Sequence, residues 1–322
     1  MSNPRQLVRD ALDQAITVLV VMHVHPDGDT TGSALALGHV LRERGKTVTV
    51  VCTDPVDERY HYLTANEAIV TWDGLREGSF DAVVTVDCGD IRRTGNEERV
   101  KTVGRQLINI DHHASNPGFA DINWIDHAAN ATGVLIYQLL QEWQHPLSDF
   151  TAQALYTSLS TDTGSFMYPS TTSESLAIAS ILAREINQLG RLNLALWAHR
   201  TWAETALAGW ALTHVQASPS RRVVWVSLPY QIIDSLGTTD ADADAIIDWI
   251  RPIKTAEVAV VLRQLEPDGP IKVSWRSSRF DVSQWAQQFG GGGHVYSSAA
   301  IVHSALPEAE DAVLKHIAEI VW

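Results

Sequence analysis

The stretch from His23 to Asp29, which contains His-Val-His-Pro-Asp-Gly-Asp, is the densest group of side chains that could do chemistry. It brings the imidazole of His23 and the carboxylates of Asp27 and Asp29 onto one short, turned segment. Hard and borderline cations take carboxylate oxygen and neutral imidazole together, so this composition favours a metal site. The alternative is a polar, solvated turn in which Asp27 or Asp29 caps a following helix.

Three later segments share this character, because each follows a predicted core element and carries Asp or His. They contribute Asp87, then Asp111, His112 and His113, and finally Asp162. In an open parallel sheet, such loops meet at the carboxyl ends of the strands, where ligands bind. Four loops of this kind are what a two-metal site needs, with one carboxylate able to bridge both ions.

The elements that must position these residues alternate between strand and helix patterns. Apolar β-type runs occupy 16–22, 46–52, 80–86 and 105–110, and helical patterns occupy 4–15, 30–44, 132–143 and 149–159. This alternation predicts an α/β protein whose N-terminal domain, residues 1–188, is a doubly wound, mostly parallel sheet.

The rest of the chain predicts a second, smaller domain. The pattern looks wholly helical from about 172 to 214, and we expect residues 189–214 to form a helical linker. A C-terminal α/β domain, residues 215–322, then follows with strands at 222–228, 257–265 and 271–276, a short helix at 282–289, a glycine-rich segment and a last helix. A length of 322 residues suits two domains.

Composition restricts the class of partner. The net charge of −14 argues against a protein that coats long nucleic acid through a basic surface. It does not exclude a protein that binds a small phosphate ester, because bound divalent cations would reverse the local potential.

Cys52 and Cys88 lie in apolar strand-like runs, which favours core thiols in a reducing cytosol over a disulfide. No signal peptide or membrane span is visible, so we expect a soluble cytoplasmic protein with no membrane partner.

Five motifs in order resemble the DHH phosphoesterase superfamily, and together they cover nearly the whole chain. They are His-x-x-x-Asp-x-Asp at 23–29, Asp-Cys-Gly-Asp at 87–90, Asp-His-His at 111–113, Thr-Asp-Thr-Gly at 161–164, and Gly-Gly-Gly-Gly-His at 290–294 after the segment 272–277. The superfamily includes RecJ nucleases, NrnA-type nano-RNases that also act on 3′-phosphoadenosine-5′-phosphate (pAp), cyclic-dinucleotide phosphodiesterases and family II pyrophosphatases.

The resemblance implies a ligand set for two metal ions. His23 and Asp27 would bind the first ion, Asp87 would bridge, and the second ion would be bound by Asp29, His112 and Asp162. The family metal is usually manganese, which agrees with a mixed imidazole and carboxylate shell, so two Mn²⁺ are expected, with Mg²⁺ or Co²⁺ as substitutes.

Three further residues of the first domain receive roles from the resemblance. Asp111 would orient an imidazole, and His113 would face the substrate phosphate. His25 occupies a position where relatives often carry Asn or Ser, and we interpret it as a phosphate or loop contact.

In the second domain the resemblance is to the DHH-associated substrate-binding domain. Glycines allow backbone amides to approach a phosphate closely, and arginine suits bidentate phosphate binding. The expected substrate-binding residues are Arg276, Ser277, Gly291, Gly292, Gly293 and His294. The alternative is a flexible glycine hinge beside a strand arginine. Relatives commonly follow the glycine run with Ala-Ala-Gly, whereas this chain continues Val-Tyr-Ser-Ser-Ala-Ala-Ile at 295–301, which bears on the shape of the pocket.

The leading hypothesis is a manganese-dependent phosphoesterase that trims short oligonucleotides to mononucleotides and dephosphorylates pAp. One alternative is hydrolysis of cyclic or linear dinucleotides such as c-di-AMP or pApA. Another is a catalytically inactive nucleotide-binding regulatory protein, although the complete ligand set speaks against it. The expected partners are short oligonucleotides or nucleotides and not long duplexes, and a homodimer is left open. The acidic balance and short length disfavour a RecJ-like nuclease, and the glycine-rich domain disfavours a pyrophosphatase.

Overall fold

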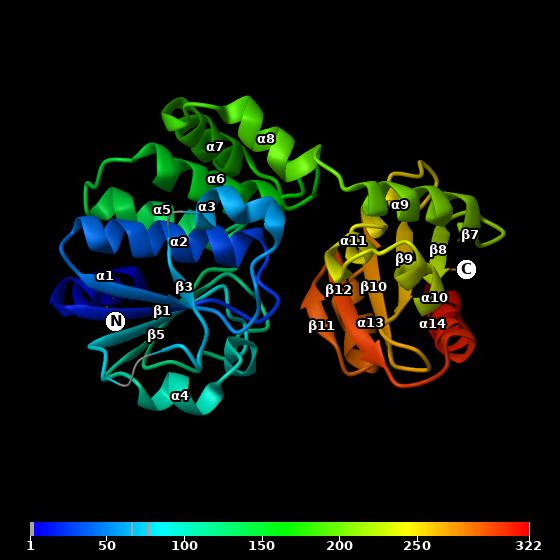
Figure 1. The fold of residues 1–322 in the computed structure, drawn as a ribbon, viewed down its shortest axis with the longest axis horizontal. Helices are drawn as coiled ribbons and strands as arrows, with labels where there is room; N and C mark the ends of the chain where they lie inside the picture. Colours follow the sequence, from blue (N-terminus) through cyan, green and yellow to red (C-terminus); the bar gives the residue numbers. More distant parts are fainter. Residues whose placement is uncertain (1–2, 66, 76–77, 322) are drawn as a thin grey trace. The chain divides into compact units, whose positions relative to one another are not determined.

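A computed structural model describes residues 3–65, 67–75 and 78–321 of the chain. It divides into two compact units, Met1–His199 and Arg200–Trp322, and each has its own sheet (Figure 1). The residues 189–214, predicted as a linker, contribute one helix to the first unit and one to the second.

The sheet of the first unit is parallel throughout and has the strand order β3-β2-β1-β4-β5-β6. Its strands are β1 (Thr17–Val21), β2 (Thr47–Val51), β3 (Ile69–Val70), β4 (Ala82–Val86), β5 (Leu107–Asp111) and β6 (Ile122–Ile125). The chain runs from β1 outward to β3 and then returns to place β4 on the other side of β1. The loops that leave β1 and β4 therefore diverge at a topological switch point, which is where parallel sheets bind ligands.

Helices cover both faces of this sheet, as a doubly wound fold requires (Figure 1). The α-helices are α1 (Pro4–Gln14), α2 (Gly28–Glu43), α3 (His61–Thr64), α4 (Glu97–Thr102), α5 (Thr132–Glu142), α6 (Asp149–Asp162), α7 (Ser173–Glu185) and α8 (Leu189–Trp197), with 3₁₀ turns η1 (Glu58–Tyr60) and η2 (Ile91–Thr94). Val18 and Val20 of β1 face the core that contains α2, α5 and α6, whereas Leu19 and Val21 face the core beneath α4. The predicted α/β class and the doubly wound parallel sheet are confirmed.

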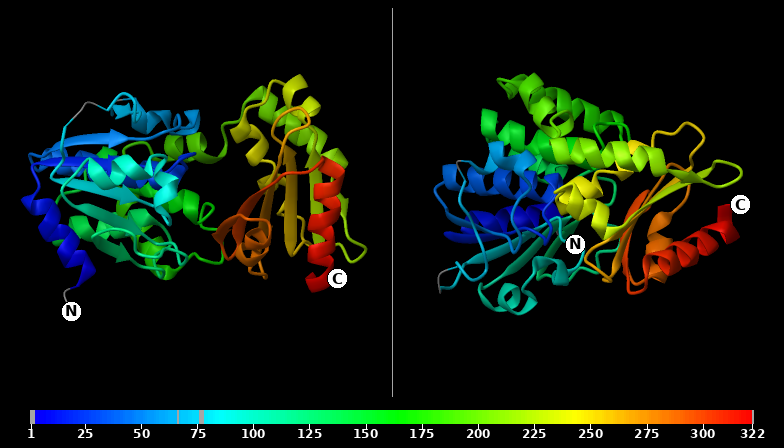
Figure 2. Two further views of the ribbon diagram at one scale, coloured as in Figure 1. Left: turned by 90° about the horizontal axis from the view of Figure 1, so that it is seen from below. Right: turned by 45° about the vertical axis from the view of Figure 1, so that its right-hand side comes forward.

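The second unit has a mixed sheet with the order β11-β12-β10-β9-β8-β7, in which only β8 and β9 are parallel. Its strands are β7 (Gln216–Ala217), β8 (Val223–Leu228), β9 (Val258–Gln264), β10 (Ile271–Ser277), β11 (Gly292–His294) and β12 (Ser297–Val302). Its helices are α9 (Trp202–His214), α10 (Tyr230–Ser235), α11 (Asp240–Asp244), α12 (Ile247–Ile250), α13 (Val282–Gln288) and α14 (Leu306–Val321). Apolar residues of β9 alternate between two cores, and α14, red in Figure 2, packs on one of them.

Two local predictions differ from the structure. The stretch 172–214 is not continuous helix, because α7, α8 and α9 are separated by non-helical residues at 186–188 and 198–201, and Thr201 caps the last of them. Part of the glycine run is a strand, because Gly292–His294 pairs with β12. Cys52 and Cys88 are buried free thiols, as predicted. Among the residues that the structure describes, no helix combines the length and apolarity needed to cross a bilayer.

Candidate metal centre

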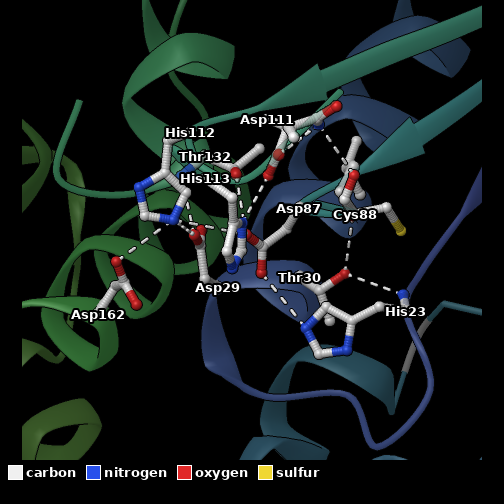
Figure 3. A network of polar contacts seen from close by, with 12 residues as sticks. His23, Asp29, Thr30, Asp87, Cys88, Asp111, His112, His113, Thr132 and Asp162 are labelled. Carbon is white, nitrogen blue, oxygen red and sulfur yellow. Dashed lines mark hydrogen bonds and ion pairs between the residues drawn. The ribbon is translucent and has the colours of Figure 1, made fainter. Parts of the chain in front are cut away.

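Seven predicted residues of the first unit converge at the carboxyl end of its sheet (Figure 3). They follow β1 and β4, end or follow β5, and close α6, and they are His23, Asp29, Asp87, Asp111, His112, His113 and Asp162. Asp27, in the loop after β1, joins them because its Oδ1 lies 3.5 Å from Nε2 of His23. Residues separated by more than a hundred positions thus form one polar cluster, as the switch-point topology predicts.

Among the described residues, three groups of this cluster have potential ligand atoms that all lie within 4.8 Å of one another, and Asp87 belongs to each: the first is His23, Asp27 and Asp87, the second is Asp29, Asp87 and His112, and the third is Asp87, Asp111 and His113. In the first group, Nε2 of His23 lies 3.3 Å from Oδ2 of Asp87. In the second, Nε2 of His112 lies 3.6 Å from Oδ1 of Asp87 and 3.5 Å from Oδ2 of Asp29. Asp162 is not a member of that group, but its Oδ2 also lies 3.5 Å from Nε2 of His112. The two oxygens of Asp87 therefore face different imidazoles, which is the arrangement of a bridging carboxylate.

The backbone of Asp87 adopts a left-handed conformation, with φ of 58°. Asp tolerates this region better than most residues, although it remains unusual outside glycine. The turn lets the chain leave β4 sharply and directs the carboxylate into the cluster, where Oδ1 also accepts a 3.1 Å hydrogen bond from the hydroxyl of Thr132.

Asp27 has both of the roles that the sequence left open, because it caps α2 and also faces a histidine of the cluster. Its Oδ1 accepts hydrogen bonds from the backbone N–H groups of Asp29, at 3.0 Å, and Thr30, at 3.1 Å, so it caps α2. This cap starts the helix at Gly28, two residues before the predicted Thr30. The same side chain faces His23, so capping does not remove it from the cluster.

Both histidines that face the carboxylates have the hydrogen bonding expected of metal ligands. Nδ1 of His23 lies 2.7 Å from the carbonyl of Val24, and Nδ1 of His112 lies 3.1 Å from the carbonyl of Ala129. A proton on each Nδ1 would leave the lone pair of Nε2 directed at the carboxylates, the usual arrangement around a bound cation. Among the described residues, the buried Nε2 of His23 has no hydrogen-bond partner, so the donor set fits a divalent ion.

The shifted pKa values of the cluster also favour a site for a divalent cation. Burial, together with the charges of Asp87 and Asp162, raises the pKa of Asp29 well above its usual value. Burial also raises the pKa of Asp162 to about 6. Burial alone would lower the pKa of His112, but Asp162, Asp29 and Asp87 outweigh it and raise that pKa to about 10. The carboxylates thus repel one another and attract positive charge, which divalent cations would supply.

A second chain of polar residues supports His113. Nδ1 of His113 lies 2.7 Å from Oδ1 of Asp111, and Nδ2 of Asn116 donates to Oδ2 of Asp111 at 2.6 Å. Asn116 also donates to Asn109, whose own amide donates to the hydroxyl of Thr85. Sequence reasoning missed Asn116, Asn109 and Thr85. For Thr85 and Asn109 the available signal was a polar residue within an apolar strand, β4 and β5 respectively, whereas Asn116 lies in the loop after β5 and had no such signal.

His25 is not brought into the cluster. Its side chain is 90% exposed, and its ring lies beside Asp54, whose carboxylate accepts the backbone N–H of His25 at 2.6 Å. Sequence reasoning also missed Arg93, which borders the cluster, because its Nη2 lies 3.2 Å from Nδ1 of His23. The phosphate contact expected of His25 remains a prediction.

The predicted substrate residues of the second unit lie on β10 and β11, except Gly291, which directly precedes β11. Nη1 of Arg276 donates to the carbonyl of Trp275 at 3.0 Å, whereas its buried Nε has no hydrogen-bond partner among the described residues. Ser277 is committed to the turn after β10, since its hydroxyl donates to the carbonyl of Glu257 and accepts the N–H groups of Arg279 and Phe280.

The glycine run has a structural role that the sequence alone left open. A Cβ on Gly291 would collide with the carbonyl of Ala299, and one on Gly293 would lie 2.5 Å from the carbonyl of Ser297. These two glycines let β11 approach β12 closely, whereas Gly292 borders open space. His294 pairs with Ser297 at the end of the same ladder.

Comparison with known proteins agrees with this description. Residues 17–159 match the DHH family N-terminal domain, and residues 226–322 match the DHHA1 domain. A probable bifunctional oligoribonuclease and PAP phosphatase NrnA of Streptococcus mutans is 27% identical over 92% of both chains. The bifunctional oligoribonuclease and PAP phosphatase NrnA of Thermus thermophilus is 29% identical over 94% of this chain and 89% of its own.

Solved structures share the fold. An exopolyphosphatase-related protein from Bacteroides fragilis superposes with a TM-score of 0.88 at 24% identity, over 97% of this chain and 96% of that protein. RecJ from Thermus thermophilus, in complex with Mn²⁺, has a TM-score of 0.52 at 16% identity, over 98% of this chain and 54% of RecJ. The chain therefore carries a DHH family N-terminal domain at residues 17–159, followed by a DHHA1 domain at residues 226–322.

Proposed function

We propose that this protein is a two-metal phosphoesterase that hydrolyses short oligonucleotides to mononucleotides and dephosphorylates pAp. The observation that carries the proposal is that the first and second ligand groups overlap at Asp87. The names of the relatives from Streptococcus mutans and Thermus thermophilus, oligoribonuclease and PAP phosphatase, support the choice of substrates.

In this proposal His23, Asp27 and Asp87 hold the first ion. The second ion is held by Asp29, Asp87, His112 and Asp162. Manganese suits a shell that mixes two imidazoles with carboxylate oxygens, and Mg²⁺ or Co²⁺ could substitute for it. When bound, the two ions would stabilise the charge on the phosphoryl oxygens and lower the pKa of water at the site.

The remaining residues of the cluster act on the phosphate and its surroundings. Asp111 binds Nδ1 of His113 and so orients the ring, which leaves Nε2 as the atom to donate to a phosphoryl oxygen. Thr132 holds Oδ1 of Asp87 in place from the first turn of α5. In the second unit, the unpartnered Nε of Arg276 supports a role in binding a phosphate that does not react.

The net charge of −14 supports a preference for short substrates, because it offers no extended basic track to a long strand. The two buried free thiols are in keeping with a cytoplasmic location, which we also propose.

The test is a substrate panel with the purified full chain and Mn²⁺: pAp, RNA of two, five and twenty nucleotides, pApA and c-di-AMP. We expect turnover of pAp and the two-mer, and a steep fall in kcat/KM with length. Asp87→Asn should abolish turnover while circular dichroism stays unchanged, because it removes the negative charge and one of the two oxygens of the carboxylate proposed to bridge both ions. Asp90→Asn is the matched control, since Asp90 lies in the same loop but pairs with Arg92.

Three outcomes would contradict the proposal. Full turnover by metal-free protein or by folded Asp87→Asn would exclude the two-metal site. Equal kcat/KM on the two-mer and the twenty-mer would exclude the short-substrate preference. Turnover confined to c-di-AMP and pApA, with none of pAp or of a two-mer of another sequence, would replace the proposed substrates with di-adenylate signals.

A further inference from the structure

The carboxylate of Asp29 is enclosed by donors from the protein. Its side chain is 2% exposed, and Oδ1 accepts hydrogen bonds from the hydroxyls of Ser158, at 2.5 Å, and Ser33, at 3.1 Å. The N–H of Gly133 also points to Oδ1, at 3.3 Å. Oδ2 accepts the N–H of Thr132 at 2.8 Å and lies toward His112 (Figure 3). Oδ1 is thus surrounded by donors from the protein, while Oδ2 faces His112, another member of the second ligand group.

Ser158 is the central donor of this arrangement. Its hydroxyl accepts the N–H of Gly133 at 3.0 Å and can then direct its single proton to Oδ1 of Asp29. The first turn of α5, which supplies the N–H groups of Thr132 and Gly133, adds the positive end of a helix dipole to the same carboxylate.

Close helix packing makes this contact available. A Cβ on Gly133 would collide with the hydroxyl of Ser158, and a Cβ on Gly32 would collide with the carbonyl of Ala154 one turn earlier on α6. Glycine at these two positions therefore lets α2 and α5 approach α6 until Ser158 reaches Asp29. Both serines and Thr132 are fully buried, so water does not compete for these bonds.

We propose that Ser158 is a positioning residue of the second metal site, which holds Oδ1 of Asp29 so that Oδ2 is presented to the ion. The proposal rests on the two-ion site proposed above. Groups that orient a ligand typically change metal affinity about ten- to a hundredfold when removed. Among the described residues, no hydrogen bond joins Ser158 to His23 or Asp27, so the effect should be confined to the second ion.

Ser160 provides a matched control on the same helix. It is also fully buried, and its hydroxyl accepts the indole N–H of Trp197 at 3.0 Å, a contact that does not involve the cluster. Ser160→Ala and Ser158→Ala each remove one buried hydroxyl from α6. A merely structural role for Ser158 predicts that the two variants lose similar stability and bind metal alike.

The experiment titrates Mn²⁺ into metal-stripped full chain and follows free Mn²⁺ by electron paramagnetic resonance, with thermal unfolding as a second readout. We expect two ions per wild-type chain, and in Ser158→Ala one unchanged dissociation constant and one raised about ten- to a hundredfold. Ser160→Ala should match wild type, and Ser33→Ala should show a smaller shift of the same ion, because its bond is longer.

Wild-type affinity for both ions in Ser158→Ala, or equal weakening of both, would overturn the inference. If Ser158→Ala does not fold, the Ser33→Ala titration decides by the same criterion. A wild-type chain that binds fewer than two ions would overturn the two-ion site and this inference together. Two ions in wild type without hydrolysis of any substrate in the panel would instead contradict the proposed activity alone.

Discussion

Nδ1 of His113 lies 2.7 Å from Oδ1 of Asp111, and both residues are buried. The other oxygen of Asp111 accepts a hydrogen bond from Asn116, so the carboxylate is held from two sides. The orientation of His113 therefore depends on a residue three positions further along the chain.

Asn116→Ala should lower kcat because it removes the donor that holds Asp111 against His113. It should also cost about 1–3 kcal/mol in the free energy of unfolding, since a buried carboxylate oxygen loses its partner. Asn123→Ala is the control, because the amide of Asn123 donates to the carbonyl of Ala120 and not to Asp111. Kinetics on pAp and urea denaturation of both variants measure the two effects. A normal kcat in a destabilised Asn116→Ala variant would show that Asn116 supports only the fold.

Gly89→Ala should impair turnover and leave metal binding intact. A Cβ at this position would lie 3.0 Å from Cβ and 3.1 Å from Cγ of His113, so the ring must shift. Gly209→Ala, at a helical position of α9 with nothing within 4 Å of the added Cβ, should instead stabilise the protein by about 0.5–1 kcal/mol. For Gly89→Ala, kcat on pAp and Mn²⁺ titration measure turnover and metal binding; for Gly209→Ala, urea denaturation measures the gain in stability. Unchanged kcat in Gly89→Ala would argue against a positional requirement at His113.

The metal-free protein should lose stability as pH rises from about 6.5 to 10. Burial alone would lower the pKa of His23, but the nearby carboxylates of Asp27 and Asp87 outweigh it and raise that pKa to about 9. The carboxylates around His112 likewise raise its pKa to about 10. A histidine with a raised pKa stabilises the folded state below its ordinary value near 6.5, and this contribution disappears as pH passes the raised value. The loss should be on the order of 3 kcal/mol for His23 alone.

Urea denaturation of metal-stripped protein at pH 6.5, 8 and 10 measures this loss. His112→Gln should reduce the dependence, whereas His127→Gln, which alters an exposed histidine, should not. Mn²⁺ should counteract the loss, because it requires the neutral imidazoles and binds more tightly as they deprotonate. Stability that rises over this range in the metal-free protein would contradict the prediction.

Arg276→Ala should lower kcat/KM for oligonucleotides about ten- to a hundredfold, or about 1.5–3 kcal/mol, the value of one charge-assisted phosphate contact. The variant should bind Mn²⁺ normally, since the proposed ligands all precede residue 163. The kcat/KM of the same variant for a small artificial phosphodiester without a second phosphate should fall much less. Arg279→Ala is the control, because Arg279 is exposed and pairs with Glu257. Loss of metal, or equal slowing on both substrates, would exclude the proposed role of Arg276. His294→Ala should behave like Arg276→Ala if the glycine-rich segment grips the same phosphate.

The sequence by itself determined the local parts of this protein. Apolar runs marked β1, β4 and β5 within one or two residues, and the polar residues directly after them became the members of the cluster. This succeeds because alternation, capping and turn chemistry depend on neighbours along the chain, as the cap that Asp27 provides for α2 illustrates.

Only the tertiary structure decided which distant groups meet. The pairing of β1 with both β2 and β4, which brings Asp87 to His23, depends on burying the two apolar faces of the sheet between helices. The contact between Ser158 and Asp29 spans 129 positions and needs glycines where three helices cross. The hydroxyl of Ser277 is used by hydrogen bonds in a turn, and the ring of His25 is exposed at the surface. Neither outcome follows from the local sequence, because hydrogen-bond partners and burial are set by tertiary packing.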